Sequence, residues 1–174
     1  MNQFKSFISK RLIIRPTFDQ DAELIFHLMN TPKFKKYVGD RKISSINDAK
    51  NYIHCKMLSQ LYKIGYSTYT LVKKSNGNKI GICGLYDRNG IEGIDIGFSI
   101  LPQFERLGYA YESTSRIIKA AFEEFKMKEL KAITDQKNIS SQALLKKLGF
   151  KYTGKTVLPN ENDELLLFEI KKLE

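Results

Sequence analysis

Apolar residues alternate with polar ones, or form short runs, in seven segments that turn-forming residues separate. Segments of this length, rich in Ile, Leu, Val, Tyr and Phe, are typical of β-strands. The sequence SNGN at 75–78 indicates a hairpin turn between two of them. Strands are therefore expected at 11–16, 66–72, 79–86, 91–101, 130–134, 151–158 and 164–171.

Other segments place apolar residues three and four positions apart, which is the spacing of an amphipathic helix. The clearest of them is 109–125. A first helix is expected to be capped by Asp19 or Asp21, and a second by Asn47 or Asp48, because these side chains accept hydrogen bonds from free N–H groups. Shorter helices or turns are expected at 31–37 and at 140–148, the latter closed by Gly149.

The order of these elements is strand, two helices, three antiparallel strands, helix, strand, helix and two strands. This order predicts an α+β fold in α/β/α layers, with a mixed, twisted, mainly antiparallel sheet of about seven strands and helices on both faces. No repeat, low-complexity tract or linker composition interrupts the chain. We therefore expect a single domain over residues 1–174.

The chain is basic, since 29 Lys and Arg stand against 19 Asp and Glu, for a formal charge of +10. This charge favours anionic partners, such as a nucleotide cofactor, RNA or an acidic protein surface, without choosing among them. The basic residues are scattered, however, and no RNA-binding motif is present. Nucleic acid is therefore not expected as a partner, except indirectly through the ribosome.

No apolar run approaches the roughly 18 residues that span a bilayer, and the N-terminus lacks the apolar region and cleavage site of a secretion signal. The sequence thus predicts a cytoplasmic protein without a membrane partner, in which Cys55 and Cys83 are free thiols. The cysteines form no C-x-x-C pair, and neither His27 nor His54 has a second ligand at helical spacing. Both histidines are interpreted as structural or surface residues, and no metal site is expected.

The strand at 91–101 leads through a turn with one glycine into the helix at 109–125. N–H groups at a helix N-terminus, together with the helix dipole, bind anions such as phosphate. Gly108 can adopt a positive φ and lets a ligand approach the backbone. Arg106 adds either a phosphate contact or only surface charge. Neither G-x-x-x-x-G-K-[ST] nor G-x-G-x-x-G is present, so the turn is neither a P-loop nor a dinucleotide-binding fingerprint.

Two segments stand out together, LPQFERLGYAYE at 101–112 and NISSQALLKKLGF at 138–150. In this order they resemble the cofactor site of the GNAT acyl-CoA N-acyltransferases, and within them the RimJ/RimL-like branch. Gly108 and Ala110 match the family pattern Arg/Gln-x-x-Gly-x-Gly/Ala. Glu105 departs from it, and its carboxylate should turn away from a bound pyrophosphate. Further similarity lies in KRLIIRP at 10–16, IGICGL at 80–85 and DIGF at 95–98.

The resemblance implies acetyl-CoA as the acetyl-donor cosubstrate, with its pyrophosphate on the backbone that opens the long helix. In this family two neighbouring strands splay apart, so the pantetheine amides are expected to pair with backbone of the strand at 91–101. Asn138 would bind the pantetheine arm from the other side. The residues implied in cofactor binding are Ser99, Ile100, Leu101, Arg106, Leu107, Gly108, Tyr109, Ala110, Tyr111, Asn138 and Ser141.

The resemblance also implies transfer of the acetyl group to a primary amine by direct attack in a ternary complex. Such a reaction needs a proton acceptor, an N–H donor for the thioester carbonyl and a proton donor for the leaving thiolate. Asp95 is the candidate base, since a buried sheet would raise its pKa, and backbone N–H groups within 98–101 are candidate carbonyl donors. Ser141 is the candidate acid, although it also suits helix capping. Tyr152 competes for the acid role but suits the core better, and Glu23, Asp87 and Glu92 stay open as other acid–base candidates.

The acceptor is left open by the sequence, but the first two helices and the loops at 64–69 and 159–163 are expected to select it. The branch modifies N-terminal α-amines of ribosomal proteins, and relatives act on amino acids, polyamines or aminoglycosides. Peptide N-termini, ribosomal proteins and small amines are therefore all candidates, although a basic protein attracts polyamines poorly. The resemblance also leaves open a homodimer through the C-terminal strands. The alternative function is a non-catalytic regulatory module that binds CoA or RNA.

Overall fold

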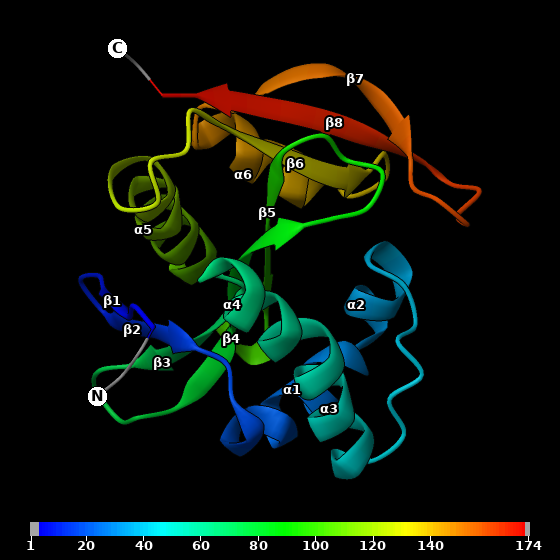
Figure 1. Cartoon of the computed structure of the whole chain (residues 1–174). Coiled ribbons are helices and arrows are strands. Elements are labelled where there is room, and N and C mark those ends of the chain that lie inside the picture. Colours follow the sequence, from blue (N-terminus) through cyan, green and yellow to red (C-terminus); the bar gives the residue numbers. More distant parts are fainter. Residues whose placement is uncertain (1–3, 173–174) are drawn as a thin grey trace.

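The computed structural model describes residues 4–172. Within this range the strands form one sheet in the order β1-β2-β3-β4-β5-β6-β8-β7 (Figure 1). Neighbouring strands are antiparallel except for β5 and β6, which run parallel. The strands are β1 (Phe7–Ile8), β2 (Leu12–Pro16), β3 (Thr68–Lys73), β4 (Lys79–Asp87), β5 (Ile94–Ile100), β6 (Glu129–Asp135), β7 (Lys151–Val157) and β8 (Glu164–Lys171).

The mixed, mainly antiparallel sheet confirms the predicted fold class, and the seven expected strands are all present close to their predicted bounds. The additional strand is β1, which pairs Phe7 with Ile14 and Ile8 with Ile13 of β2. Two residues are too short to show an alternating pattern, so no sequence pattern indicated this strand. The strand expected at 91–101 is shorter, since it begins at Ile94 after a turn that includes Gly93.

Helices cover both faces of the sheet, as predicted (Figure 1). The run from residue 46 to residue 64 is continuous and contains one π-helical stretch. None of the helices in residues 4–172 is long and apolar enough to cross a membrane. The α-helices are α1 (Ala22–Met29), α2 (Pro32–Tyr37), α3 (Ile46–Tyr52), α4 (Ser59–Ile64), α5 (Tyr109–Glu123) and α6 (Ile139–Lys147), with 3₁₀ turns at Asp19–Asp21 and Pro102–Phe104 and the π-helical stretch at Ile53–Leu58.

The caps of the first helices differ from the prediction. Ser45, rather than Asn47 or Asp48, caps α3, because its Oγ accepts the Asp48 N–H at 3.0 Å. Asp21 does occupy the N-cap position of α1, at the end of a 3₁₀ turn that begins at Asp19, but its side chain makes no cap bond to α1.

Asp21 instead forms a buried ion-pair cluster. Its oxygens accept from Arg15 NH1 and NH2 at 2.7 and 2.8 Å, and Lys79 Nζ lies 2.8 Å from Oδ1. Burial raises the pKa of Asp21, but the hydrogen bonds from Arg15 and Lys79 outweigh it and hold the pKa below its usual value. The cluster thereby links β2, β4 and the turn before α1.

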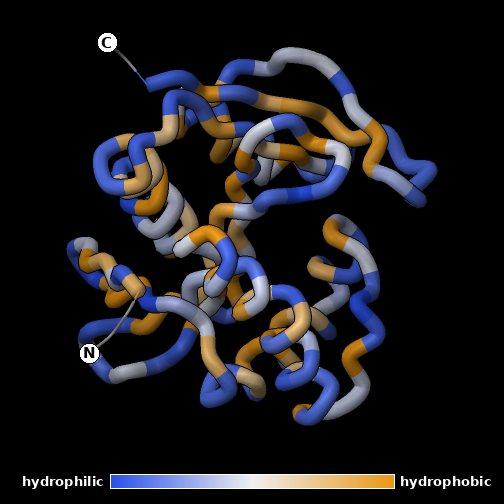
Figure 2. The backbone as a smooth tube through the Cα atoms, in the orientation of Figure 1, coloured by the Kyte–Doolittle hydropathy of each residue, from blue (hydrophilic) through white to orange (hydrophobic). Residues whose placement is uncertain are grey.

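Two hydrophobic cores lie on opposite faces of the sheet. Figure 2 shows apolar stretches gathered toward the centre of the molecule, with most of the turns hydrophilic. The first core joins the sheet to α5 and α6, and its buried members include Leu12, Ile14, Leu71, Ile80, Ile96, Ile117, Leu145 and Phe168. The second core joins the sheet to α1, α2, α3 and α4, and its buried members include Ile25, Leu28, Phe34, Ala49, Ile53, Leu61 and Ile82.

Candidate active site

The sheet opens between β5 and β6. On one side, β5 pairs with β4 from Gly81↔Ile100 to Asp87↔Ile94. On the other side, the described part of the chain shows register with β6 through Asp95↔Lys131 alone. The C-terminal half of β5 therefore has a neighbour on one side only, and its other edge is open, which leaves backbone groups free for a ligand.

The residues predicted to meet the pantetheine arm lie at this open half of β5. Ser99 and Ile100 belong to β5 beyond its contact with β6. Leu101 follows the strand, but its N–H donates to the Ile80 carbonyl at 2.9 Å and its own carbonyl accepts from Phe104 N–H at 2.9 Å. Leu101 therefore has no free N–H to offer to the pantetheine arm. This differs from the prediction, which gave Leu101 the same role as Ser99 and Ile100.

The loop that follows β5 has the geometry of an anion-binding turn. Arg106 and Gly108 both adopt positive φ, at 59° and 84°, on either side of Leu107. When residues with positive φ alternate with residues of ordinary φ, successive backbone N–H groups point into one concave nest. Gly108 is the N-cap of α5, and the first N–H with an intrahelical partner is that of Glu112, which bonds Gly108 at 3.0 Å. The N–H groups of Tyr109 to Tyr111 thus have no partner within the helix.

Glu105, the departure from the family pattern, does turn aside. Its Oε1 accepts from Lys33 Nζ of α2 at 2.9 Å. The two side chains are 28% and 46% exposed, so the pair contributes little to stability. Its effect is local: the carboxylate is held against a positive charge on α2.

The candidate base, Asp95, is buried and paired. Its two oxygens accept from Arg88 Nε and NH2 at 3.0 and 3.3 Å, and its side chain is 2% exposed. Burial raises the pKa of Asp95, and Arg88 offsets only part of this effect. The raised pKa agrees with the reasoning from sequence, but the Arg88 partner was not foreseen. The base role itself stays a prediction.

Asp95 lies on the face of β5 that looks away from α5. Ile96 and Ile100 belong to the core beside α5, so the alternation of the strand turns Asp95 and Gly97 toward the face that α1–α4 cover. The ring of Tyr86 lies across this surface, because a Cβ added at Gly97 would be 3.1 Å from its Cε2. A tyrosine, an arginine and a carboxylate therefore gather on one face of β4 and β5.

The turn between β7 and β8 reaches this region. Gly90, in the turn between β4 and β5, packs so closely on Pro159 that an added Cβ would collide with the proline ring. The 159–163 turn, which was predicted to help select the acceptor, therefore lies beside the turn that holds Arg88.

On the β6 side, Asn138 begins α6. Its Oδ1 accepts from Ser141 N–H at 3.2 Å and from Ser140 Oγ at 3.0 Å. Asn138 is thus the cap, and the capping role considered for Ser141 was wrong. Within residues 4–172 the Ser141 hydroxyl has no hydrogen-bond partner, so it is free for a ligand. Tyr152, expected in the core, is 53% exposed, because β7 is the edge strand of the sheet, although its ring packs edge-on against Phe168.

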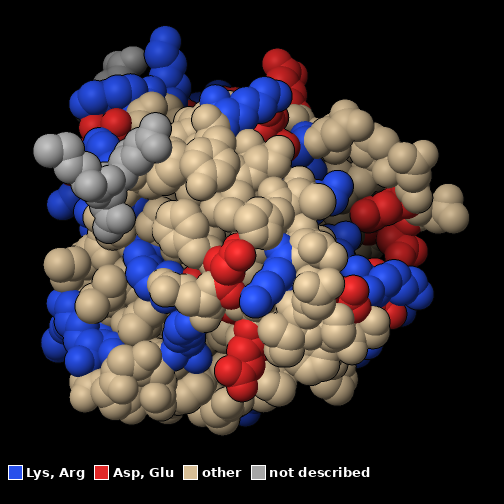
Figure 3. Space-filling model, turned by 60° about the horizontal axis from the view of Figure 1, so that its bottom comes forward, with Lys and Arg blue, Asp and Glu red and all other residues tan. Residues whose placement is uncertain are grey.

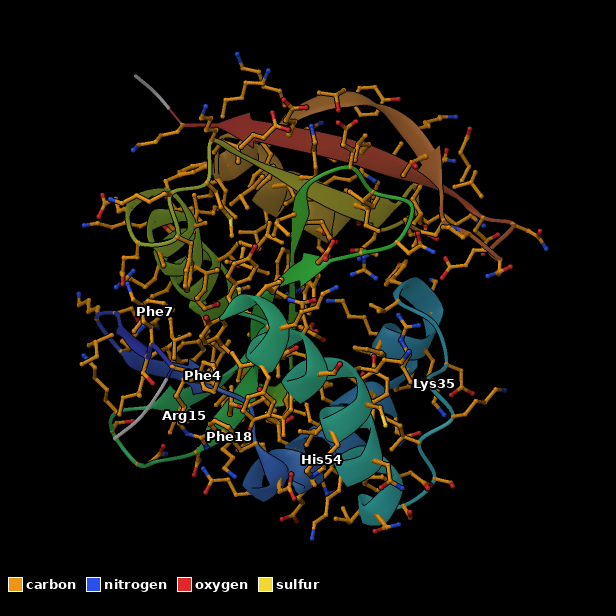
Figure 4. All side chains as sticks on the ribbon, in the orientation of Figure 1. Phe4, Phe7, Arg15, Phe18, Lys35 and His54 are labelled. Carbon is orange, nitrogen blue, oxygen red and sulfur yellow. The ribbon has the colours of Figure 1, made fainter. Side chains whose placement is uncertain are left out.

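Other polar groups lie away from the opening. The side chains of His27 and His54 are 60% and 56% exposed, and His54 Nε2 lies 2.7 Å from Asp19 Oδ1. Among the described residues, no group of three or more His, Cys, Asp or Glu is placed to hold a metal ion. A hollow of about 160 Å³ lies beside β2 and is lined partly by Phe4, Arg15 and Phe18 (Figure 4). The Arg15 guanidinium there is already bound to Asp21.

Sequence reasoning missed the contact of Arg11 with the loop before α5 and the side chains that hold Arg11 there. Arg11 donates to the Leu107 carbonyl and to Glu112, and Glu112 also accepts from Ser9. These contacts join residues about a hundred positions apart, so no local pattern reveals them. The charge complementarity of Arg11 and Glu112 was visible, but nothing in the sequence paired them.

The comparisons agree with this geometry and define the class of protein, an acetyltransferase. Residues 11–151 match the model of the family described as acetyltransferase (GNAT) domain. This match spans most of the chain, which therefore belongs to the GNAT acetyltransferase family. The uncharacterized N-acetyltransferase YoaA of Bacillus subtilis (strain 168) is 28% identical over 145 residues, which cover 83% of this chain and 81% of that protein.

Solved structures share the fold. An acetyltransferase of the GNAT family from Bacillus anthracis superposes with a TM-score of 0.80 at 20% identity, over 96% of this chain and 98% of that one. RimL, described as the ribosomal L7/L12 alpha-N-protein acetyltransferase in complex with coenzyme A, superposes with a TM-score of 0.80 at 14% identity, over 96% and 98%. At these identities the structures establish the fold alone, whereas the family match establishes a GNAT acetyltransferase.

Proposed function

We propose that this protein is a single-domain, acetyl-CoA-dependent N-acetyltransferase of the RimJ/RimL-like branch, which acetylates a primary amine by direct attack in a ternary complex. One observation supports it above the others. The open edge of β5 leads into a loop whose N–H groups are gathered at the start of α5. A long ligand fits this arrangement if its amides lie along the open edge of β5 and its diphosphate lies at the N–H groups of the loop.

In this proposal the diphosphate of the donor binds the N–H groups from Arg106 to Tyr111. The pantetheine amides pair with the backbone of Ile100, because Ser99 and Leu101 alternate with it and turn their backbone groups toward β4. Asn138 and Ser141 approach from the side of β6. Leu101 contributes only the second lone pair of its carbonyl oxygen, because its N–H is bonded to Ile80 and the carbonyl already accepts from Phe104 N–H.

The chemistry assigns three roles. Asp95 accepts the amine proton, directly or through water, once the amine or the water reaches its buried carboxylate. A backbone N–H within 98–100 polarises the thioester carbonyl. The Ser141 hydroxyl, free of other partners in the described chain, protonates the leaving thiolate. Orientation of the two substrates supplies much of the remaining rate.

The acceptor is proposed to be a peptide or protein N-terminus, with a small amine as the other candidate. The name of RimL, a ribosomal-protein acetyltransferase, supports the first, and the +10 charge disfavours polyamines. A ribosomal partner, a cytoplasmic location and a homodimer remain predictions that go with this choice. A direct RNA partner is less well supported, since the basic residues are scattered along the sequence and, on the face drawn in Figure 3, Lys and Arg lie among Asp and Glu.

The test measures CoA released from acetyl-CoA with α-amine peptides, amino acids, polyamines and aminoglycosides as acceptors. CoA should be quantified by chromatography, because the exposed Cys55 would itself react with a thiol reagent. Turnover is expected with one class of acceptor. Gly108→Glu places a carboxylate among the loop N–H groups and should abolish turnover, and Gly108→Ala, which shares the strain of positive φ without the charge, serves as its matched control.

The alternative is a non-catalytic module that binds CoA. It predicts retention of CoA by mass spectrometry and no release of CoA from acetyl-CoA with any acceptor. That result would contradict the proposed transfer reaction and the base role of Asp95.

A further inference from the structure

Arg11 precedes β2 in the chain, yet its side chain lies against the loop before α5. Its Nε donates to Glu112 Oε2 at 2.7 Å, and its NH1 donates to the Leu107 carbonyl oxygen at 2.9 Å. Its guanidinium carbon lies 4.1 Å from the centre of the Tyr109 ring. The backbone N–H of Arg11 also donates to Glu112 Oε1, at 2.6 Å. One residue thus contacts the loop, the N-terminus of α5 and its first turn.

The bond to Leu107 affects which dipoles the loop offers to an anion. Leu107 lies between Arg106 and Gly108, the two residues with positive φ. The N–H groups of such a loop attract an anion, whereas a carbonyl turned to the same side would repel it. Because Arg11 binds the Leu107 carbonyl, this oxygen is engaged within the protein.

Arg11 also brings positive charge to the loop. Its NH2 lies close to Gly108, since a Cβ added there would be 3.2 Å from this nitrogen. Glu112 fixes the guanidinium in this place and itself accepts from Ser9 Oγ at 2.7 Å. Burial raises the pKa of Glu112, but the hydrogen bonds from Arg11 and Ser9 outweigh it and lower the pKa, so Glu112 stays ionised.

We propose that Arg11 is a positioning residue for the acetyl donor. It holds the 106–108 loop in the conformation that binds the donor's diphosphate, and it places a positive charge next to this loop. The proposal rests on the proposed function, whose donor it concerns. A lysine would not replace Arg11, because a compact ammonium group lacks the planar fork that bonds Glu112 and Leu107 while stacking on Tyr109.

The test compares two donors with the same thioester. Acetyl-CoA contains the diphosphate, whereas S-acetyl-pantetheine lacks it. For Arg11→Met we expect the KM for acetyl-CoA and the calorimetric Kd for CoA to rise about tenfold, or about 1.4 kcal/mol. The kcat at saturation, and kcat/KM with S-acetyl-pantetheine, should stay within about twofold of wild type. Arg11→Lys should resemble Arg11→Met rather than wild type.

Arg116→Met is the matched control. Arg116 also joins α5 to the β1–β2 hairpin, since its Nε donates to the Ile8 carbonyl at 3.3 Å and its guanidinium lies 4.7 Å from the Phe7 ring centre. Its position in the middle of α5 keeps it away from the loop. This variant should lower the melting temperature without changing the Kd for CoA.

An unchanged Kd for CoA in folded Arg11→Met, or equal losses with both donors, would overturn the role of Arg11 while leaving acetyl transfer intact. Wild-type activity in Arg11→Lys would overturn it as well. CoA binding by the wild type without turnover would refute the transfer reaction alone, and calorimetry would still decide on Arg11. A wild-type protein that binds no CoA would overturn both proposals.

Discussion

Asp95→Asn separates two roles that the site gives to this carboxylate, proton acceptor and half of a buried ion pair. The substitution keeps the shape of the side chain and removes its charge. Arg88 would then face a neutral amide instead of the carboxylate that it now binds at 3.0 and 3.3 Å. Loss of the proton acceptor predicts a lower kcat, whereas loss of the ion pair predicts a lower stability. The sizes of these two effects therefore decide between the roles.

The loss of stability follows from burial. Removing one partner of a buried ion pair costs about 3–5 kcal/mol. We expect the lower figure, because Arg88 is 30% exposed and can turn toward water. For a domain of this size, about 3 kcal/mol lowers the melting temperature by roughly 6–12 °C. Loss of a general base, by contrast, lowers kcat by about 10²–10⁴-fold.

The assay pairs thermal unfolding with kcat at saturating acetyl-CoA and acceptor, below the melting temperature of each variant. Arg88→Gln is the control, since it breaks the same pair and keeps the carboxylate. If Asp95 is the base, Asp95→Asn should lose at least about a hundredfold in kcat and Arg88→Gln less than about tenfold. An Asp95→Asn variant that keeps kcat within about threefold of wild type, at a lowered melting temperature, would refute the base role.

Three further outcomes are expected. Burial raises the pKa of Cys83 to about 12, so a thiol reagent should label exposed Cys55 in the native protein and Cys83 only after unfolding; equal labelling rates would contradict this. Asp21 has a folded-state pKa below its unfolded value of about 4, so its stabilisation is present above about pH 4 and lost as pH falls through the lower, folded-state pKa. Denaturant unfolding between pH 2 and 6 should therefore show a steeper acid loss in wild type than in Asp21→Asn, and parallel curves would disprove the assignment. Gly84→Ala would place a Cβ 2.6 Å from the Tyr86 hydroxyl and should cost about 1–3 kcal/mol by calorimetry; an unchanged melting temperature would show that Tyr86 moves freely.

The sheet and the long helix were predictable because their signals are local. In β6, buried and partly buried residues alternate from Glu129 to Asp135, as the sequence indicates. The positive φ of Gly108 was likewise readable from one glycine between a strand and a helix. In β1, however, two residues cannot show a period, and their pairing is set by β2.

The partners of individual polar side chains were not predictable from the sequence. Glu105 was expected to turn outward, but Lys33, which donates to its carboxylate, lies in α2, 72 positions earlier in the chain. The partner of Asp95 is only seven positions away, across the β4–β5 hairpin. The sequence shows that these two opposite charges flank a predicted turn. It does not show the register of the hairpin, which brings the two side chains together. The cap at Asn138 was missed because neighbouring serines suit the same role.

The separation of the two cores bears on how this fold diversifies. The core beneath α1–α4 supports the proposed acceptor side, and the core beside α5 and α6 supports the donor loop; the sheet stands between them. Substitutions at distant positions without shared partners have nearly additive effects on stability. Substitutions in α1–α4 that suit a new amine can therefore occur without affecting the stability of the 106–108 loop. A change of acceptor would then require no change in the loop proposed to bind the donor.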